Sequence, residues 1–163
     1  MLSGFSKFFK RYFKLPHWDD EEVKTNSYDL NLIKRWEGLE LDSSLDTGGV
    51  WTIGWGHTST ARPNQRITLA EAEILLARDV KTAVDDVRRL VDVPLNHNQR
   101  SALISFVFNI GGTQFSTSTL RRKLNRQDYE GASKEFLRWV YDNGKFIQGL
   151  KNRRKEEVRK FLS

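Results

Sequence analysis

The fold of this chain is decided by one stretch, which reads Trp36-Glu37-Gly38-Leu39, then Leu45-Asp46-Thr47-Gly48-Gly49, then Val50-Trp51-Thr52-Ile53-Gly54-Trp55-Gly56-His57-Thr58. It carries two carboxylates nine residues apart, Glu37 and Asp46, and the Thr52 hydroxyl six residues further on. The β-branched and aromatic residues after the glycine pair predict a small antiparallel hairpin or sheet. Because glycine and tryptophan frame three reactive side chains, we interpret the stretch as a functional site.

A helix is expected to precede this stretch and to end at Glu37. Asn26 or Ser27 would cap its start, and Ile33 would lie on its inward face. Gly38 provides the stop, as glycine commonly does after a last helical turn. A carboxylate in that place faces the negative end of the helix dipole, which disfavours its charged form.

Beyond the hairpin the pattern is helical to the end of the chain. Thr68-x-x-Glu71 and Asn96-x-x-Gln99 are capping boxes, so we expect a long helix that ends at Pro94 and a central helix closed by Asn109–Gly112. Further helices are expected at 118–125, 128–141 and 149–162. The inward stripe of the long helix comprises Leu69, Ala72, Leu75, Leu76, Val80, Val84 and Val87. The predicted fold is therefore α+β, with a small β lobe, a larger helical lobe and a ligand cleft between them.

Composition limits the classes of function. With 163 residues, 38% of them hydrophobic, the chain suits one compact domain and a short extension. The absence of cysteine excludes disulfides and cysteine nucleophiles. A net charge of +6 favours polyanionic partners, but no zinc-finger spacing, RNP-like strand or arginine-rich tail supports nucleic acid among them. His57 has no second histidine or acidic cluster at ligand spacing, so we expect no metal site.

The two carboxylates suit glycosidic bond cleavage. That reaction needs an acid to protonate the leaving oxygen and a carboxylate on the other side of the sugar ring. Glu37, at a helix end beside Trp36, is expected to hold a proton, while Asp46, in a solvated turn, is expected to stay ionised. Thr52 would share a water with Asp46, as an inverting mechanism requires. The bare pair is weak evidence, because an Asp before Gly-Gly is usually a turn residue.

The chain resembles the phage-type lysozymes, or endolysins, of glycoside hydrolase family 24. The family signature is a Glu, eight residues, an Asp, five residues and a Thr. Glu37, Asp46 and Thr52 match it at that spacing, and the residues from Thr52 to Thr58 also resemble the family's sequence. Later pieces match in the family's order: Asn98-Gln99-Arg100-x-Ala102-Leu103-x-Ser105-Phe106-x-Phe108-Asn109-x-Gly111, Phe115-x-x-Ser118-Thr119-Leu120, Leu124-Asn125, Trp139 and Gly149-Leu150-x-x-Arg153-Arg154-x-x-Glu157. One departure is Ser44-Leu45, which stands where many members carry an aromatic residue.

The resemblance implies a lysozyme-like fold and hydrolysis, without a cofactor, of the β-1,4 bond between N-acetylmuramic acid and N-acetylglucosamine in peptidoglycan. Glu37 would be the general acid, and Asp46 and Thr52 would position the water. Phe108 and Ser118 become candidate sugar contacts, although Phe108 suits the core equally well. The paired arginines at 153 and 154 are interpreted as structural ion-pair partners of Glu157 or of another helix.

Residues 1–26 lie outside the resemblance, which covers about 27–163, and we assign them to a basic amphipathic extension and linker. Apolar residues recur at helical spacing over 1–15, with cations largely on the other face and no acid. This composition is typical of an interfacial helix on an anionic membrane, and a helix packed on the domain is the alternative. The cations interrupt the apolar run that a secretion signal or a spanning helix needs.

Two other functions stay open at this point. A lytic transglycosylase cleaves the same bond with one Glu and no water, and the presence of both Asp46 and Thr52 argues against it. A wall- or membrane-binding protein on the same scaffold would need no catalytic residue.

As an endolysin, the chain would be a monomer made in the host cytoplasm that acts on the wall in the periplasm and causes lysis, with peripheral membrane association through residues 1–15.

Overall fold

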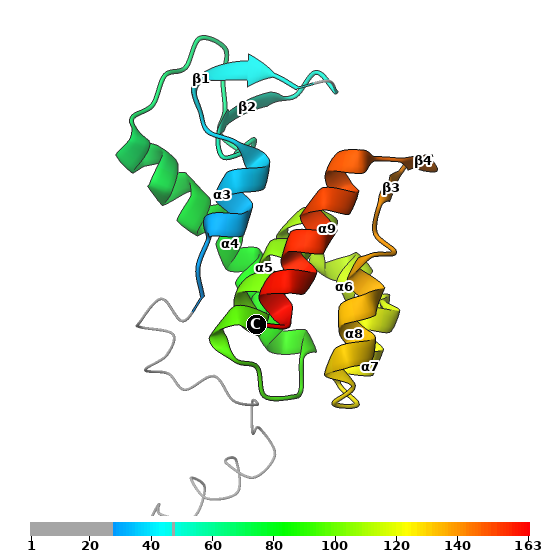
Figure 1. The fold of residues 1–163 in the computed structure, drawn as a ribbon. Helices are drawn as coiled ribbons and strands as arrows, with labels where there is room; N and C mark the ends of the chain where they lie inside the picture. The colour runs from blue at the N-terminus through cyan, green and yellow to red at the C-terminus, as the bar shows by residue number, and fades with distance from the viewer. Residues whose placement is uncertain (1–27, 47) are drawn as a thin grey trace, which may run out of the picture.

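The computed structural model describes residues 28–46 and 48–163. Figure 1 shows a small β lobe formed by β1 (Glu40–Leu45) and β2 (Trp51–Gly54), and a helical lobe that contains the C-terminus. Helix α4 (Leu69–Leu90) runs from the β lobe into the helical lobe. The predicted α+β class with a minor antiparallel sheet is therefore confirmed.

The β lobe is a hairpin extended by a short third segment. β1 and β2 are antiparallel, with Ser44 opposite Thr52, and the turn between them closes through a hydrogen bond from the Asp46 N–H to the Val50 carbonyl, 2.9 Å. The third segment contains no strand of its own and joins β1 through a single bridge between Arg66 and Asp42. The middle of β1, residues 41–43, therefore pairs with residues 65–67, while Glu40 before it and Ser44 and Leu45 after it pair with β2.

Helix α3 (Asn31–Glu37) ends as predicted but begins later. Glu37 is its last residue, and Gly38 follows with φ +70°. The predicted start at Asn26 or Ser27 is wrong, because residues 28–30 are not helical. Asp29 decides the start: its carboxylate accepts the Asn31 N–H, and its own N–H donates to the Ser101 hydroxyl. That hydroxyl comes from another helix, so no local pattern predicts the contact.

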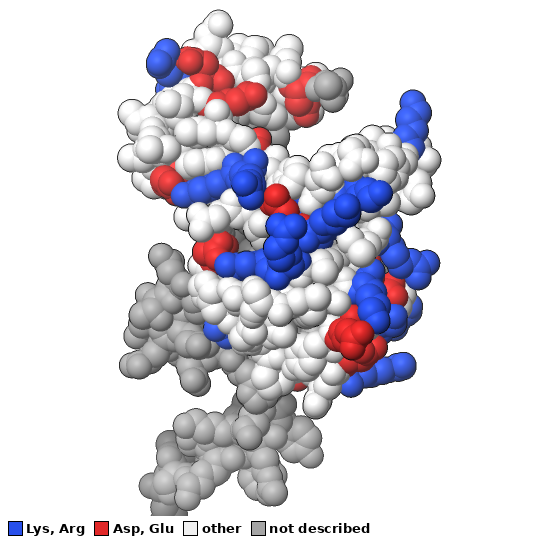
Figure 2. All heavy atoms as spheres, viewed as in Figure 1, with Lys and Arg blue, Asp and Glu red and all other residues white. Residues whose placement is uncertain are grey.

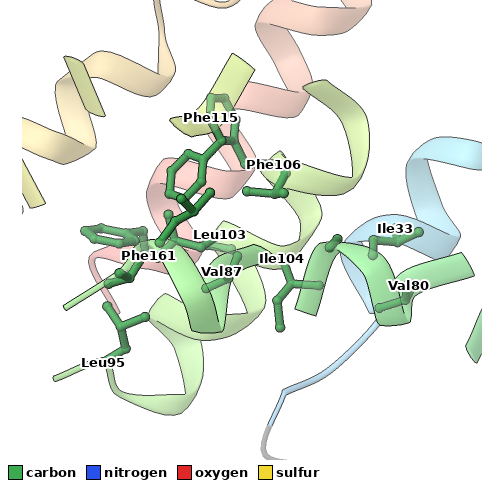
Figure 3. Close-up of a cluster of buried hydrophobic side chains, with 14 of the residues drawn as sticks. Ile33, Val80, Val87, Leu95, Leu103, Ile104, Phe106, Phe115 and Phe161 are labelled. Atoms are coloured by element: carbon green, nitrogen blue, oxygen red, sulfur yellow. The ribbon is translucent and has the colours of Figure 1, made fainter. Parts of the chain in front are cut away.

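Both predicted capping boxes are present, on α4 and on α5 (His97–Ile110). Residues 100–107 of α5 are all buried, which confirms it as the central helix. Figure 3 shows its Leu103, Ile104 and Phe106 among side chains from α4, with Ile33 of α3 at one end and Phe161 near the other. In α4 the expected inward Leu69 is exposed, and the helix ends at Leu90, before Pro94.

The C-terminal part is more finely divided than predicted. Its helices are α6 (Gly112–Thr117), α7 (Thr119–Leu124), α8 (Tyr129–Phe136) and α9 (Gln148–Phe161). Helix α6 was not predicted, and α8 stops well short of residue 141. A hairpin of β3 (Tyr141–Asp142) and β4 (Lys145–Phe146) follows. Its turn has φ +46° at Asn143 and +75° at Gly144, the backbone for which Asn-Gly pairs are favoured in tight hairpins.

The predicted amphipathic helix over residues 1–15 and the boundary at residue 26 lie outside the described residues. Within the described ranges, no helix is both long and apolar enough to cross a bilayer.

Asp29 should stabilise the start of α3 in a pH-dependent way. Burial raises the pKa of Asp29, but hydrogen bonds from Lys160 and the Asn31 N–H, with the Lys160 and His97 charges, outweigh burial and lower it. A lowered pKa means that the contribution is complete above the unfolded value near 3.8 and is lost as the pH falls through the folded pKa. Asp29→Asn should therefore cost about 1–2 kcal/mol at pH 7 and much less at pH 2.5, measured by urea unfolding.

The matched control is Asp42→Asn, which removes an exposed 3.3 Å ion pair with Arg66. It should change the free energy of unfolding by less than about 0.5 kcal/mol at either pH. An equal cost for Asp29→Asn at both pH values would contradict an ionic role for Asp29.

Candidate active site

Glu37 is fixed by a contact that the sequence did not reveal. Its Oε1 accepts a 2.7 Å hydrogen bond from Nη1 of Arg153, on α9. The Arg153 side chain is only 5% exposed, and its guanidinium also donates to the Glu157 carboxylate at 3.2 Å and to the Ser105 carbonyl at 3.3 Å. A planar guanidinium held by three acceptors has little freedom to turn, so the end of α3 is tied to α5 and α9.

A buried charge cluster supports this contact. Glu157 is fully buried and accepts from the Ser105 hydroxyl at 2.7 Å, and its other oxygen lies 2.7 Å from Nε of Arg154. Burial lowers the pKa of Arg154 to about 10, which still leaves it charged at neutral pH. The sequence-based interpretation of both arginines as partners of Glu157 agrees with this arrangement, whereas the Arg153 contact with Glu37 was missed.

Asp46 occupies the tip of the β hairpin. Its Oδ1 accepts two backbone hydrogen bonds of 2.8 Å, from the N–H groups of Gly48 and Val50. A Cβ at Gly48 would lie 3.3 Å from that same oxygen, so glycine leaves the carboxylate room. Asp46 is thus a turn residue, as an Asp before Gly-Gly suggests, and the backbone hydrogen bonds of the turn fix one of its oxygens.

Thr52 and Glu37 line the same cavity of about 180 Å³, together with Gly38, Glu40, Ile53, Gly54 and Gly56. Gly56 has φ +78°, and a Cβ there would lie 3.5 Å from Oε2 of Glu37. The structure therefore brings together two of the three predicted residues. Asp46 is not among the side chains that line this cavity. Figure 2 shows the surface hollowed between the β lobe and the helical lobe.

Phe108 and Ser118 lie in the helical lobe, away from that cavity. Phe108 is half-buried and packs against the core. The Ser118 hydroxyl caps α7, accepting from the Arg121 N–H at 3.1 Å and donating to the Phe115 carbonyl at 2.8 Å. Ser118 also lines a surface pocket of about 400 Å³ beside Trp139. Their contact with sugar stays a prediction.

His57 is a structural side chain. It is buried, its Nδ1 lies 2.8 Å from an Asp79 oxygen, and its Nε2 lies 2.7 Å from the Thr60 hydroxyl. Asp79 belongs to α4, so this pair joins the β lobe to the long helix. Among the residues that the structure describes, no three His, Asp or Glu side chains gather as metal ligands would.

Sequence reasoning missed Arg153 and Glu40 as neighbours of the candidate acid. Arg153 is 116 residues from Glu37, and no local signal joins them. Glu40 follows Glu37 by three residues. Because the helix stops at Gly38 between them, helical periodicity does not predict that the two side chains line one cavity.

Comparison with known proteins identifies the family. The family model described as phage lysozyme matches residues 34–157. The endolysin of Acyrthosiphon pisum secondary endosymbiont phage 1 is 44% identical over 138 residues, which cover 82% of this chain and 94% of that protein.

Two solved structures are similar to this one. The muramidase domain of SpmX from Asticaccaulis excentricus is 38% identical with a TM-score of 0.77, over 82% of this chain and 94% of that domain. A mutant of P22 lysozyme is 36% identical with a TM-score of 0.78, over 85% and 97% of the two chains. The family model spans most of the chain, and the match includes the end of α3, the hairpin and most of α9, which carry the residues of the candidate site. The chain therefore belongs to the phage lysozyme family.

Proposed function

We propose that this chain is an endolysin that hydrolyses the β-1,4 bond between N-acetylmuramic acid and N-acetylglucosamine, with Glu37 as the acid. The observation that carries the proposal is that Glu37, held at its helix end by Arg153, shares one cavity with Thr52. Family membership and the muramidase among the similar structures support the same reaction and substrate.

The contacts of Glu37 support different roles for its two oxygens. Arg153 donates to Oε1, so the proton to be transferred belongs on Oε2, which lies against Gly56. Oε2 gives this proton to the glycosidic oxygen as its bond to the sugar carbon breaks. The contact with Arg153 thus orients the Glu37 carboxyl group, and Oε2 is left to deliver the proton. General acid catalysis needs such positioning.

Asp46 and Thr52 would handle the water. Oδ1 of Asp46 is held by two backbone N–H groups, which leaves Oδ2 to accept the proton of the attacking water. Thr52 orients the same water, whose oxygen bonds to the sugar carbon on the face opposite the leaving group. The product is inverted at that carbon. A transglycosylase needs no water, so the presence of both side chains favours hydrolysis.

The basic surface fits this substrate. Figure 2 shows a band of Lys and Arg side chains across one face. Helix α9 carries Lys151, Lys155 and Arg159, which repeat every four residues and are exposed or half-buried. The stem peptides of bacterial peptidoglycan carry free carboxylates, so a cationic face raises the local concentration of the enzyme on the wall.

We also propose that residues 27–163 form the catalytic domain of a monomer made in the host cytoplasm and acting in the periplasm. Residues 1–15 would add a cationic amphipathic helix for anionic membrane, since their apolar and basic side chains fall on different faces.

Glu37→Gln should lower the rate of muropeptide release by about 100- to 10,000-fold, because an amide cannot protonate the leaving oxygen. Asp46→Asn and Thr52→Ala should also slow turnover, Thr52→Ala less. The control is Glu130→Gln, which changes an exposed carboxylate paired with Lys134 on α8 and should leave the rate unchanged. Wild-type activity in Glu37→Gln would instead indicate a binding protein on a lysozyme scaffold.

The reaction products should carry reducing-end muramic acid, because water is the nucleophile. Mass spectrometry of muropeptides released by the wild-type protein measures this directly. Products that end in 1,6-anhydromuramic acid would identify a transglycosylase and refute the assignment of water to Asp46 and Thr52.

Deletion of residues 1–16 should abolish sedimentation with anionic phospholipid vesicles and leave hydrolysis of purified peptidoglycan intact. Neutral vesicles are the control, because the attraction is largely electrostatic. If the truncated protein bound anionic vesicles as well as the full chain, the proposed membrane role of this segment would be wrong.

A further inference from the structure

Glu40 is a third carboxylate in the cavity that Glu37 and Thr52 line. It is exposed at the start of β1, and no Lys or Arg of the described ranges forms an ion pair with it. Its Oε2 accepts a 2.5 Å hydrogen bond from the Ser44 hydroxyl. Ser44 in turn lies opposite Thr52 in the hairpin register, so Glu40 is connected through one side chain to a proposed catalytic residue.

A strand irregularity brings Glu40 and Ser44 together. Residues four apart on a regular strand are separated by about 13 Å along the chain, too far for a direct contact between these short side chains. Here Glu40 pairs with Gly54 and Ser44 with Thr52, so four residues along β1 match two along β2. The extra residues turn toward the segment at 65–67, where Asp42 bridges Arg66. This bulge shortens the path between the two side chains.

The hydrogen bonds along this path have a fixed direction. An ionised carboxylate only accepts, so the Ser44 hydroxyl donates to Glu40 and presents a lone pair to Thr52. The Thr52 hydroxyl lies 3.3 Å from the Ser44 carbonyl oxygen and 3.5 Å from the Ser44 hydroxyl oxygen. Both are then acceptors, so the Thr52 hydrogen points at Ser44. The lone pairs of Thr52 are left for a hydrogen of a water molecule in the cavity.

We propose that Glu40 is a positioning residue that acts through Ser44 to keep Thr52 a hydrogen-bond acceptor toward the attacking water. The inference rests on the proposed hydrolytic role of Thr52. Without Glu40, the Ser44 hydroxyl turns and donates to Thr52, which occupies one of its two lone pairs and competes with the hydrogen bond from the water. The consequence falls on the chemical step rather than on substrate binding, so kcat changes and KM does not.

The test is a set of variants assayed with soluble peptidoglycan fragments over a range of concentrations. Glu40→Ala should lower kcat about 5- to 20-fold, the effect of one misdirected hydrogen bond, with KM within about twofold. Glu40→Gln keeps an acceptor for Ser44 and should retain most of the wild-type kcat. Asp42→Ala, an exposed carboxylate on the same strand, is the control and should match the wild type. Thermal unfolding of each variant establishes that it is folded.

The decisive variant is the double change Glu40→Ala with Ser44→Ala. It removes the misdirecting hydroxyl and leaves Thr52 its carbonyl acceptor, so kcat should rise from the Glu40→Ala value to that of Ser44→Ala alone. A double variant as slow as Glu40→Ala would overturn the proposal, as would a Glu40→Gln variant as slow as Glu40→Ala. If kcat fell in Thr52→Ala but stayed normal in Glu40→Ala, this inference alone would be refuted. If Thr52→Ala kept the wild-type kcat, the proposed role of Thr52 would be refuted as well.

Discussion

The contact between Arg153 and Glu37 is the interaction on which the rest of the site depends. It connects the end of α3 to α9, and the same guanidinium reaches Glu157 and the Ser105 carbonyl of α5. Buried charges are costly unless they are paired and hydrogen-bonded, and removing one partner of such a set costs about 3–5 kcal/mol. Here two guanidiniums face two carboxylates, with added hydrogen bonds from Ser105 and to Asn109. The cluster therefore holds the candidate acid in one orientation against the helical lobe.

The β lobe needs its own attachments, because a two-stranded hairpin has little core. Ile53 and Trp55 are buried against the helices, Lys34 lies 4.8 Å from the Trp55 ring centroid, and the His57–Asp79 pair joins the lobe to α4. Gly54 lies against Ala72 of α4 and has φ +67°, a backbone conformation that favours glycine. These contacts attach the strands of the hairpin that carries Asp46 and Thr52 to the helices.

Two carboxylates line the cavity and a third lies at the tip of the hairpin, and each is held by a different kind of donor. A guanidinium binds Glu37, a hydroxyl binds Glu40, and two backbone N–H groups bind Asp46. Similar side chains can perform different steps because their surroundings differ. In the proposed mechanism the cation directs the proton of Glu37, the hydroxyl links Glu40 to Thr52, and the backbone holds one Asp46 oxygen while the other accepts from water.

The sequence by itself determined the features whose partners are three or four residues apart. The capping boxes at Thr68 and Asn96, the helix stop at Gly38 and the hairpin turn after Asp46 are local, and each lies where its pattern indicated. The order of motifs along the chain identified the family in the same way. The second hairpin also had a local signal, Asn143-Gly144. The predicted helix at 128–141 was too long, and it covered the start of the strand that precedes this turn.

Only the tertiary structure decided which distant groups meet. Arg153 reaches Glu37 across 116 residues, and Asp29 reaches Ser101 across 72. The bulge in β1 exists because residues 41–43 leave β2 and pair with the segment at 65–67. Such contacts follow from how helices and strands pack, and periodicity records which face of an element is buried but not which neighbour buries it. The candidate catalytic residues could therefore be named from the sequence, while Arg153 and Glu40, which contact or neighbour them, could not.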